Sequence, residues 1–483
     1  MRNRHFILFE KTGQEGRIRD YEFRVFFFRG NRALLKKDWL FTGFSLLAED
    51  IKPLESKGLA YTFRALKYRN FRLFFMGQGV SLIGTWMQQT AMGWLVYRMT
   101  KSAILLGSVE FFGTIPTFLL TPFAGVLADR WNRHKMVIVV QTLAMIQAFA
   151  LAILVLLGHI QVWHIIALSL VLGLINTFDI PIRQAFVMDM LEKKEDIGNA
   201  IAINSSMFNG ARIIGPSIAG VLIALVGEGW CFLLNGVSFL AVIVALFAMK
   251  VQRAQKPPSQ QHVFQEIVQG FSYTFRSVPI RSILLLLGLI SLVGMPYAVL
   301  MPVMVRNVLH GDSRVLGLLM ASIGIGALTG AYFLASRESV RGLEKIIALG
   351  CFIFSVGLIS FSFSRWLPVS MIILVLGGFG IMIHMASTNT LIQTLSDDDK
   401  RGRVLSYYTL AFRGTGPFGA FIAGALTDKI GAPHTILIGG MCCLMGAIVY
   451  VWKLPNLHKM IHQIYLKKGI ISPEMPALGT TPK

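Results

Sequence analysis

The stretch MVIVVQTLAMIQAFALAILVLLG, residues 136–158, decides the class of this protein, because no charged side chain interrupts it. An α-helix needs about 20 consecutive apolar residues to cross a lipid bilayer. A second run of this kind, TILIGGMCCLMGAIVYVW, occupies residues 435–452. The whole chain of 483 residues is 54% hydrophobic and only 15% charged, whereas soluble proteins are about 25% charged. The composition therefore predicts a protein that crosses the bilayer many times.

The apolar runs predict helices rather than the strands of a membrane barrel, because polar and apolar residues do not alternate in them. The candidate spans cover residues 71–97, 103–128, 135–158, 163–187, 200–226, 230–250, 280–305, 314–336, 344–364, 367–394, 403–428 and 434–453. A polar break at 251–279, which contains two consecutive prolines, separates six spans from six. We therefore predict an all-α integral membrane fold of about 12 transmembrane helices, arranged as two pseudo-symmetric six-helix bundles.

The predicted domains follow from this division. The N-terminal bundle occupies residues 63–250 and the C-terminal bundle 280–454, with a central linker at 251–279 and a C-terminal tail at 455–483. Residues 1–62 mix basic and aromatic side chains without periodicity. We expect a poorly ordered basic extension there, and the alternatives are an amphipathic surface segment or a start codon assigned too far upstream.

Basic side chains are distributed unequally between the two sides of the predicted membrane. Of the 46 Lys and Arg, one side carries Arg98, Lys101, Arg306, Arg314, Arg365 and Lys429, and Arg212 and Arg413 lie inside spans. The remainder lies on the side that holds both termini, and cytoplasmic loops are enriched in Lys and Arg. We therefore predict cytoplasmic termini. The formal charge of +21 indicates topology rather than nucleic-acid binding, because the basic residues flank helices and form no continuous patch.

The two halves of the chain repeat one another. ARIIGPSIAG at 211–220 aligns with FRGTGPFGAFIAG at 412–424, so Arg212 and Pro216 match Arg413 and Pro417. Leu-Gly pairs at 106–107 and 172–173 likewise match pairs at 316–317 and 376–377. Several matches in the same order indicate duplicated six-span halves, as in many secondary transporters.

The loop after the second span, GVLADRWNRHK at 125–135, resembles the G-x-L-a-D-R-x-G-R-[KR] motif of the major facilitator superfamily. In that superfamily the motif forms a charged latch that holds the cytoplasmic side closed. The resemblance assigns this role to Gly125, Asp129, Arg130 and Arg133, and an ordinary solvated loop is the alternative. Asn132 stands where a glycine is usual, and asparagine tolerates left-handed turns.

The fifth span resembles the antiporter signature of the same superfamily through Ala211, Gly215, Pro216, Ala219 and Gly220. Alanine replaces glycine at 211 and 219. Small residues four apart also permit close helix packing without any role in antiport, which is the structural alternative.

DIPIRQAFV at 179–187, GNAIAINSSMFNGARIIGP at 198–216 and RGRVLSYYTLAFRGTGPFGAFIAG at 401–424 resemble the enterobactin-exporter-type branch. The similarity covers about residues 63–454. It implies a multi-pass transporter of the bacterial inner membrane that exports siderophore-like or drug-like molecules, by proton antiport with alternating access. The alternatives are uptake or lysolipid flipping by the same fold, and an integral-membrane enzyme.

Charges inside a bilayer are costly and usually mark a pathway. Counted along their spans, Arg212 and Arg413 are expected near the midplane at pseudo-symmetric positions, where they face a central cavity and bind an anionic group or a counter-acid. A structural ion pair between the halves is the alternative. Glu110 is the proton-coupling candidate, because a carboxyl group away from water binds a proton more readily; a pore-facing polar residue is the alternative.

The other pathway candidates are weaker. Asp179 and Arg183 lie four residues apart around Pro181, so a local salt bridge is expected. His384 is titratable but is also compatible with a core histidine. Gln88, Asn204 and Asn209 are expected to line the cavity or to form hydrogen bonds between helices.

No nucleotide-binding, zinc-protease or serine-hydrolase motif is present in the sequence. Its four cysteines lie in apolar runs without metal-ligand spacing. We therefore expect a transporter and no enzyme, with no metal and no cofactor, which uses the proton gradient as its energy source. Its expected partners are the lipid bilayer, protons and a small-molecule substrate, and we expect it to act as a monomer without binding nucleic acid.

Overall fold

The computed structural model describes residues 63–130, 132–249, 271–337, 339–397 and 400–470. The side chains of residues 121–130 and of Lys194 are not described. The predictions for residues 1–62, for most of the 251–279 linker and for the end of the C-terminal tail therefore lie outside the described residues.

The first half of the chain forms one helical bundle. Its helices are α3 (Arg69–Thr100), α4 (Ala103–Arg130), α5 (Arg133–Leu156), α6 (Val162–Asp189), α7 (Ile197–Val226) and α8 (Glu228–Phe247), with short helical turns η1 (Arg64–Lys67) and η2 (Lys194–Asp196). Helix α3 packs against α7 and α8, α4 packs against α6, and α5 lies between α6 and α8. We call the side on which α3 begins the basic side, and the opposite one the distal side.

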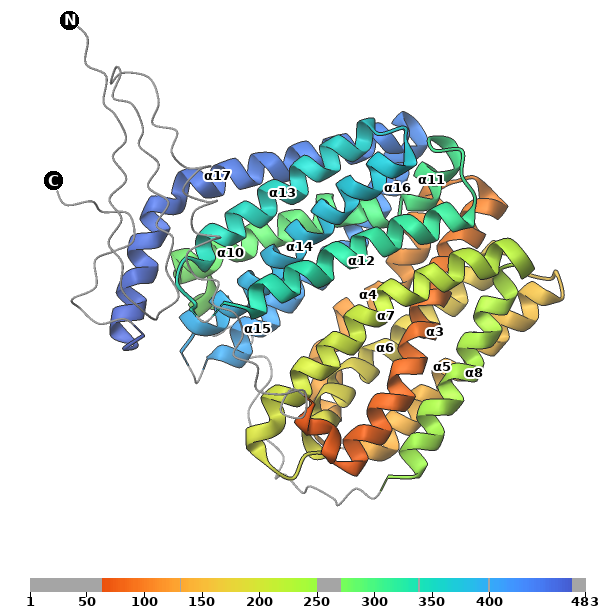
Figure 1. Ribbon diagram of the computed structural model, residues 1–483, viewed down its shortest axis with the longest axis horizontal. Coiled ribbons are helices and arrows are strands. Elements are labelled where there is room, and N and C mark those ends of the chain that lie inside the picture. Colours follow the sequence, from red (N-terminus) through yellow and green to blue (C-terminus); the bar gives the residue numbers. More distant parts are fainter. Residues whose placement is uncertain (1–62, 131, 250–270, 338, 398–399, 471–483) are drawn as a thin grey trace, which may run out of the picture.

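The second half forms a second bundle from α12 (Ser313–Ala335), α13 (Leu343–Phe363), α14 (Leu367–Leu395), α17 (Ala432–Lys467) and two interrupted spans. One interrupted span consists of α10 (Val278–Leu289), η3 (Ile290–Gly294), η4 (Met295–Ala298) and α11 (Met301–Asn307). The other consists of α15 (Arg401–Thr409), η5 (Leu410–Gly414) and α16 (Gly416–Ile430). The bundles meet where α7 packs on α12 and α4 packs on α16 (Figure 1). This agrees with the predicted all-α fold of two bundles.

Ten helices of the described residues are long and apolar enough to cross a membrane, with Val278–Asn307 counted as one. The two other predicted spans are α3 and the α15–η5–α16 segment. Helix α3 carries polar side chains, among which Gln78 and Gln88 are buried inside the bundle. The other segment is divided by the wide turn η5. Both pack along the spanning helices. The buried glutamines account for the polar sequence of α3, whereas α15 buries only Val404 and remains largely accessible.

Helix α17 continues to Lys467, beyond the end of the span predicted at residue 453. The extension follows Pro455 and turns away from the bundle axis (Figure 1). Its buried side chains, at helical spacing, are Leu454, Leu457, Ile461 and Tyr465. His458 Nδ1 lies 2.7 Å from the Glu344 carboxylate on α13, and the Tyr465 hydroxyl donates to the Val340 carbonyl at 3.1 Å. A proline followed by polar residues is typical of a helix end, but this apolar stripe holds the extension against the bundle.

Asp196 ties the start of the N-terminal bundle to the turn before α7. Its carboxylate accepts from Arg64 Nε at 2.8 Å, Lys67 Nζ at 2.7 Å and the Tyr68 hydroxyl at 2.7 Å. Hydrogen bonds from Lys67, Tyr68 and Arg64 hold the pKa of Asp196 well below its usual range. The four residues form a clamp on the basic side that remains charged at neutral pH.

We expect the Asp196 clamp to stabilise the protein with a defined pH dependence. Because the carboxylate has a lower pKa when folded, its contribution is complete above the ordinary carboxyl pKa of about 4 and is lost as the pH falls further. Thermal unfolding of the purified wild type and of Asp196→Asn between pH 8 and pH 3 checks this. The variant should have the lower Tm by a constant amount down to about pH 5, and the difference should narrow below that. A difference that already narrows between pH 8 and 6 would assign the effect to another group.

Candidate functional site

Helices α4 and α16 cross the boundary between the bundles along a continuous seam. In its middle, Phe418 packs edge-on against Phe111 and Phe118, with ring centroids 5.6 and 5.8 Å apart. Toward the distal side, the contact between the two helices is made by backbone atoms instead of side chains. A Cβ atom added to Gly107 would lie only 2.3 Å from the Ala420 carbonyl oxygen. The two helices are therefore in backbone contact near the distal side.

Helices α7 and α12 form a second seam, in which glycines again lie against backbone carbonyl groups of the other bundle. A Cβ atom on Gly220 would lie 2.6 Å from the Ser313 carbonyl oxygen, and one on Gly317 would lie 2.8 Å from the Pro216 carbonyl oxygen. The Ser313 hydroxyl donates to the Gly220 carbonyl at 2.9 Å. Gly215 faces the other way, toward Trp86 on α3, where an added Cβ would lie 2.6 Å from the Trp86 Cβ. The small residues of the antiporter-like motif thus pack α7 against both neighbours.

The seams show that the two intramembrane arginines are not at equivalent depths. The sequence repeat pairs Arg212 with Arg413, but the seam contacts pair Gly220 with Gly424, whose added Cβ would lie 2.4 Å from the Ala103 carbonyl oxygen. Arg413 lies three residues further from its seam glycine, Gly424, than Arg212 lies from Gly220, and in both spans this direction leads toward the basic side. At 1.5 Å per residue it is about 4–5 Å closer to the basic side. The prediction of pseudo-symmetric positions is therefore wrong by nearly one turn.

Arg413 lies on η5, the wide turn between α15 and α16. The turn is braced by its own bundle, since the Ser291 hydroxyl of η3 donates to the Phe412 carbonyl and the Thr415 hydroxyl lies 3.3 Å from the Gly288 carbonyl. Wide turns of this kind often occur at functional sites. The side chain of Arg413 is exposed, and the braced turn fixes the backbone that carries this cation.

The charges around Arg413 come from both bundles. Arg183 of α6 and Tyr408 of α15 lie within electrostatic range of it. Arg183 Nη2 forms the expected salt bridge with Asp179 at 3.1 Å, and Gln141 donates to the same carboxylate at 2.9 Å. Within the described part of the chain, Arg413 itself has no carboxylate within 4.0 Å. The region therefore carries uncompensated positive charge.

Arg212 is the second cation of this region. On α7, Ala211 and Gly215 face α3 while Ile213 and Gly220 face α12, so residue 212 lies on the arc between these neighbours. Its guanidinium lies over the Trp86 ring, 5.6 Å from the centroid, and Tyr297 of the other bundle is within electrostatic range. Among the described residues no carboxylate lies within 4.0 Å of it. An ion pair between the halves, the alternative for either arginine, is absent from this part of the chain.

Glu110 lies on α4 between two contact faces. Gly107 and Phe111 face α16, whereas Gly113 and Thr117 face α6. Residue 110 falls on the short arc between these faces, away from the exposed Phe112. It is half-buried, and no side-chain hydrogen bond is present for it within the described ranges. The carboxyl group is thus placed toward the centre of the molecule, near the aromatic seam.

The remaining candidates separate into two groups. Asn204 and Asn209 on α7 are half-buried, and Asn209 donates to the Ser205 carbonyl of its own helix at 2.9 Å. Residue 209 lies on the same arc as Arg212.

Gln88 and His384, by contrast, lie inside the bundles. Gln88 is 4% exposed and bonds to Gln147 at 3.1 Å and Asn235 at 2.8 Å. His384 is fully buried, with Nδ1 3.0 Å from the Ile347 carbonyl oxygen. The expectation that Gln88 lines the pathway is corrected, because its amide bonds to other helices, which was the alternative. His384 occupies a core position, as its alternative predicted, although its Nε2 has no hydrogen-bond partner among the described residues.

The latch motif lies at the end of α4 and the start of α5. Gly125, Asp129 and Arg130 belong to the last turns of α4, and their side chains lie outside the described residues. Arg133 opens α5, and its Nη1 lies 3.0 Å from the Asp189 carboxylate at the end of α6. Asn132 caps α5 by accepting from the Lys135 amide at 3.1 Å. The described part of the motif therefore joins helices of one bundle.

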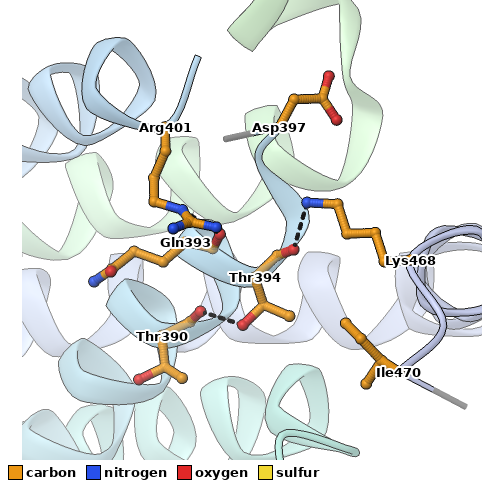
Figure 2. A pocket seen from close by; sticks show the side chains of 7 residues that line it. All are labelled: Thr390, Gln393, Thr394, Asp397, Arg401, Lys468 and Ile470. Carbon is orange, nitrogen blue, oxygen red and sulfur yellow. Dashed lines mark hydrogen bonds between the residues drawn. The ribbon is translucent and has the colours of Figure 1, made fainter. Parts of the chain in front are cut away.

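A pocket of about 690 Å³ opens on the basic side of the C-terminal bundle. Its lining residues, drawn in Figure 2, are Thr390, Gln393, Thr394, Asp397, Arg401, Lys468 and Ile470. Lys468 donates to the Thr394 carbonyl at 3.0 Å and also to the Ser396 carbonyl, and Arg401 Nε donates to the Gln393 carbonyl at 3.3 Å. The two cations thus complement the carbonyl end of α14.

A line of polar groups leads from this pocket toward Arg413. The Gln393 side chain bonds to the Asn389 side chain one turn away on α14, Asn389 interacts with Tyr408, and Tyr408 is in range of Arg413. Asn389, Gln393 and Tyr408 were not among the predicted site residues. The signal for the first two was their helical spacing, because they are four residues apart.

The sequence matches a family of known proteins over most of its length. Residues 60–470 match the family described as transmembrane secretion effector. The staphyloferrin A transporter of Staphylococcus aureus is 25% identical over 382 residues, which cover 78% of this chain and 95% of the relative. The multidrug efflux pump Tap of Mycolicibacterium fortuitum is also 25% identical (80% and 93% covered), and the enterobactin exporter EntS of Citrobacter koseri is 27% identical (78% and 89% covered).

Solved transporter structures share the fold. The POT family transporter PepTSo superposes with a TM-score of 0.63 at 12% identity, over 81% of this chain and 99% of that one. A bacterial homologue of the lysosomal transporter Spinster, in an inward-facing and unoccupied conformation, gives 0.60 at 14% identity, over 83% and 98%. At such identities the similarity concerns the fold alone. The chain belongs to the transmembrane secretion effector family of major facilitator transporters, and it is a multi-pass membrane efflux transporter rather than an enzyme.

Proposed function

We propose that this transporter exports an anionic, siderophore-like small molecule by proton antiport with alternating access. The observation that carries the proposal is the charge of Arg413, which lies within electrostatic range of Arg183 of the opposite bundle and has no carboxylate of its own among the described residues. An arginine fork binds carboxylates through paired hydrogen bonds, and a cation without a counter-ion favours an anionic ligand. The siderophore names of two relatives support this substrate class.

The direction of transport rests on topology. The excess of Lys and Arg on the basic side favours a cytoplasmic assignment for that side and for both termini, in the inner membrane of a bacterium. Both glycine-rich seams join the bundles toward the distal side, which is the arrangement expected of a state closed to the outside. The pocket with Arg401 lies on the basic side, where an anion from the cytoplasm would enter.

The energy source in this proposal is the proton gradient, with Glu110 as the coupling carboxyl. Glu110 lies between the face of α4 that contacts α6 and the face that contacts α16. Protonation or deprotonation of its carboxyl group would therefore affect the packing of α4 on both helices. The protein would need no metal or cofactor, and it would act as a monomer, because each seam is formed within one chain.

Proton release from inverted membrane vesicles tests the function. Vesicles with an acidified interior and a pH-sensitive dye are exposed to a tricarboxylate siderophore, a catecholate siderophore, a macrolide and a cationic dye. We expect one of the two anionic siderophores to release protons from vesicles that contain the wild type. Glu110→Gln should reduce this release by at least about tenfold, as loss of an essential proton carrier does, while binding of the compound persists.

The control and the contrary results are distinct. Glu192→Gln changes an exposed acid on the basic side and should leave proton release unchanged. Release that survives Glu110→Gln would keep antiport and reject the coupling residue. Release with the cationic dye alone would reject the anionic substrate class. No release from vesicles shown to contain the protein, together with accumulation of an anionic compound in whole cells, would replace export by uptake.

A further inference from the structure

Asp428, at the distal end of α16, caps a helix of the opposite bundle. Its carboxylate accepts from the backbone N–H of Ala103 at 2.7 Å, from that of Ile104 at 3.1 Å and from the Ser102 hydroxyl at 2.9 Å. These are the first residues of α4 and the residue before it. A carboxylate on the free N–H groups of a helix start is stabilised both by hydrogen bonding and by the helix dipole.

The equivalent helix of the other half is capped differently. Gly107 of α4 corresponds to Gly317 of α12 by their seam contacts, so Ser102 corresponds to Asp312. Asp312 caps its own helix, with Oδ1 2.9 Å from the Arg314 amide nitrogen and 3.3 Å from that of Val315. By the same correspondence, which pairs Gly424 with Gly220, the position of Asp428 is held by Ala224 in the first half. The α7–α12 seam therefore has a cap within its own bundle. The α4–α16 seam takes its carboxylate cap from across the boundary, beside a longer bond of 3.4 Å from the Leu105 amide to the Ser102 hydroxyl.

Other bonds cross the boundary at the same end. The Asn307 amide donates to the Tyr97 hydroxyl at 2.7 Å, and the Arg306 guanidinium lies over the Trp94 ring, 5.8 Å from the centroid. Neither supplies several charge-assisted hydrogen bonds to one group, as Asp428 does. These contacts lie beyond the aromatic seam and the glycine contacts, so separation of the bundles at the distal side must break them.

We infer that Asp428, Ser102, Ala103 and Ile104 form a distal lock, in which Asp428 is a positioning residue that holds the bundles closed on the distal side. The lock must open in every transport cycle that exposes the centre of the molecule to that side. When the α4–α16 seam opens, the N–H groups at the start of α4 must exchange the Asp428 carboxylate for water. When the α7–α12 seam opens, α12 keeps its cap, because Asp312 belongs to the same bundle.

Distances between spin labels test the inference without any substrate, so its result does not depend on the proposed cargo. Labels are attached to cysteines at Met99 and Ile430, which are exposed on α3 and α16, in a background with the four native cysteines replaced by alanine. Double electron–electron resonance on the full chain in lipid nanodiscs measures the short, closed distance and the long, open one. Asp428→Ala should lower the ratio of closed to open molecules by roughly three- to tenfold, the range that loss of an N-cap represents.

The matched control is Asp312→Ala, which removes a cap of the same type at the same end of the membrane but within one bundle. It should leave the ratio unchanged. The double variant Asp428→Ala/Ser102→Asp restores a carboxylate cap to α4 from its own chain segment, so it should recover the Tm while the ratio stays low. If Asp428→Ala did not yield folded protein, Ser102→Ala removes the bond from the Ser102 hydroxyl to Asp428, together with the 3.4 Å bond that this hydroxyl accepts from the Leu105 amide, and should give a smaller shift in the same direction.

Three results would overturn the inference. They are an unchanged ratio in Asp428→Ala, an equal shift in Asp312→Ala, and full recovery of the ratio in the double variant, since the last would show that α4 needs a cap but no bond between bundles.

Discussion

Arg413→Gln is expected to weaken binding of an anionic substrate by roughly ten- to hundredfold, the loss of one charge-assisted hydrogen-bonded contact. The guanidinium, like that of Arg212, has no carboxylate within 4.0 Å among the described residues, and glutamine keeps a polar side chain while it removes the charge. The turn that carries it is held by Ser291 and Thr415 rather than by the side chain itself. The fold should therefore survive the substitution.

Binding of a radiolabelled tricarboxylate siderophore to purified protein in nanodiscs measures the effect. Arg413→Lys retains the charge without the planar fork, so it should lose less than Arg413→Gln. Arg365→Gln is the matched control, because Arg365 lies at the distal end of the same bundle and bonds only to the Ser362 and Ser364 carbonyls among the described partners. Equal losses in Arg413→Gln and Arg365→Gln, or none in either, would reject Arg413 as the anion-binding group.

The fold was largely predictable because hydropathy and internal repetition are properties of the chain itself. The apolar runs predicted the two bundles, and the Leu-Gly pair at 106–107 correctly matched the pair at 316–317, whose glycines occupy equivalent seam positions. The sequence did not predict that α17 continues beyond Pro455, since a proline with polar neighbours is typical of a helix end. The stripe from Leu454 to Tyr465 is visible only when helical spacing is followed through the proline.

The site was less predictable because side-chain direction depends on tertiary packing. Arg212 and Glu110 each lie on the part of their helix surface between two neighbouring helices. The sequence alone does not show which part of the surface faces the neighbours, so it could not predict this placement. Gln88 is polar like a cavity residue, and only the positions of Gln147 and Asn235 show that its partners are internal. The depth of Arg413 was missed because the alignment followed the arginine and the proline, which are four residues apart in both halves, whereas the proline-to-glycine spacing is four residues in α7 and seven in α16.

Gly424→Ala is expected to shift the protein away from the distally closed state by about ten- to hundredfold, because overpacking of a tight contact costs about 1–3 kcal/mol. The added Cβ would lie 2.4 Å from the Ala103 carbonyl oxygen. That atom belongs to the backbone of the opposite bundle, so α4 and α16 must move apart. The spin-label pair at Met99 and Ile430 reports the separation, and export should fall in parallel because the closed state is depleted.

Two further glycines separate this effect from simple loss of stability. A Cβ on Gly402, in the same interrupted span, would meet nothing within 4 Å, so Gly402→Ala should leave both the label distances and export unchanged. A Cβ on Gly326 would lie 1.9 Å from the Val375 carbonyl oxygen, inside one bundle between α12 and α14. Gly326→Ala should therefore lower the Tm without favouring the open distance among molecules that remain folded. If Gly424→Ala lowered the Tm as much as Gly326→Ala and left the closed distance in place, the α4–α16 seam would be part of a single rigid core, and the two bundles would not separate along it.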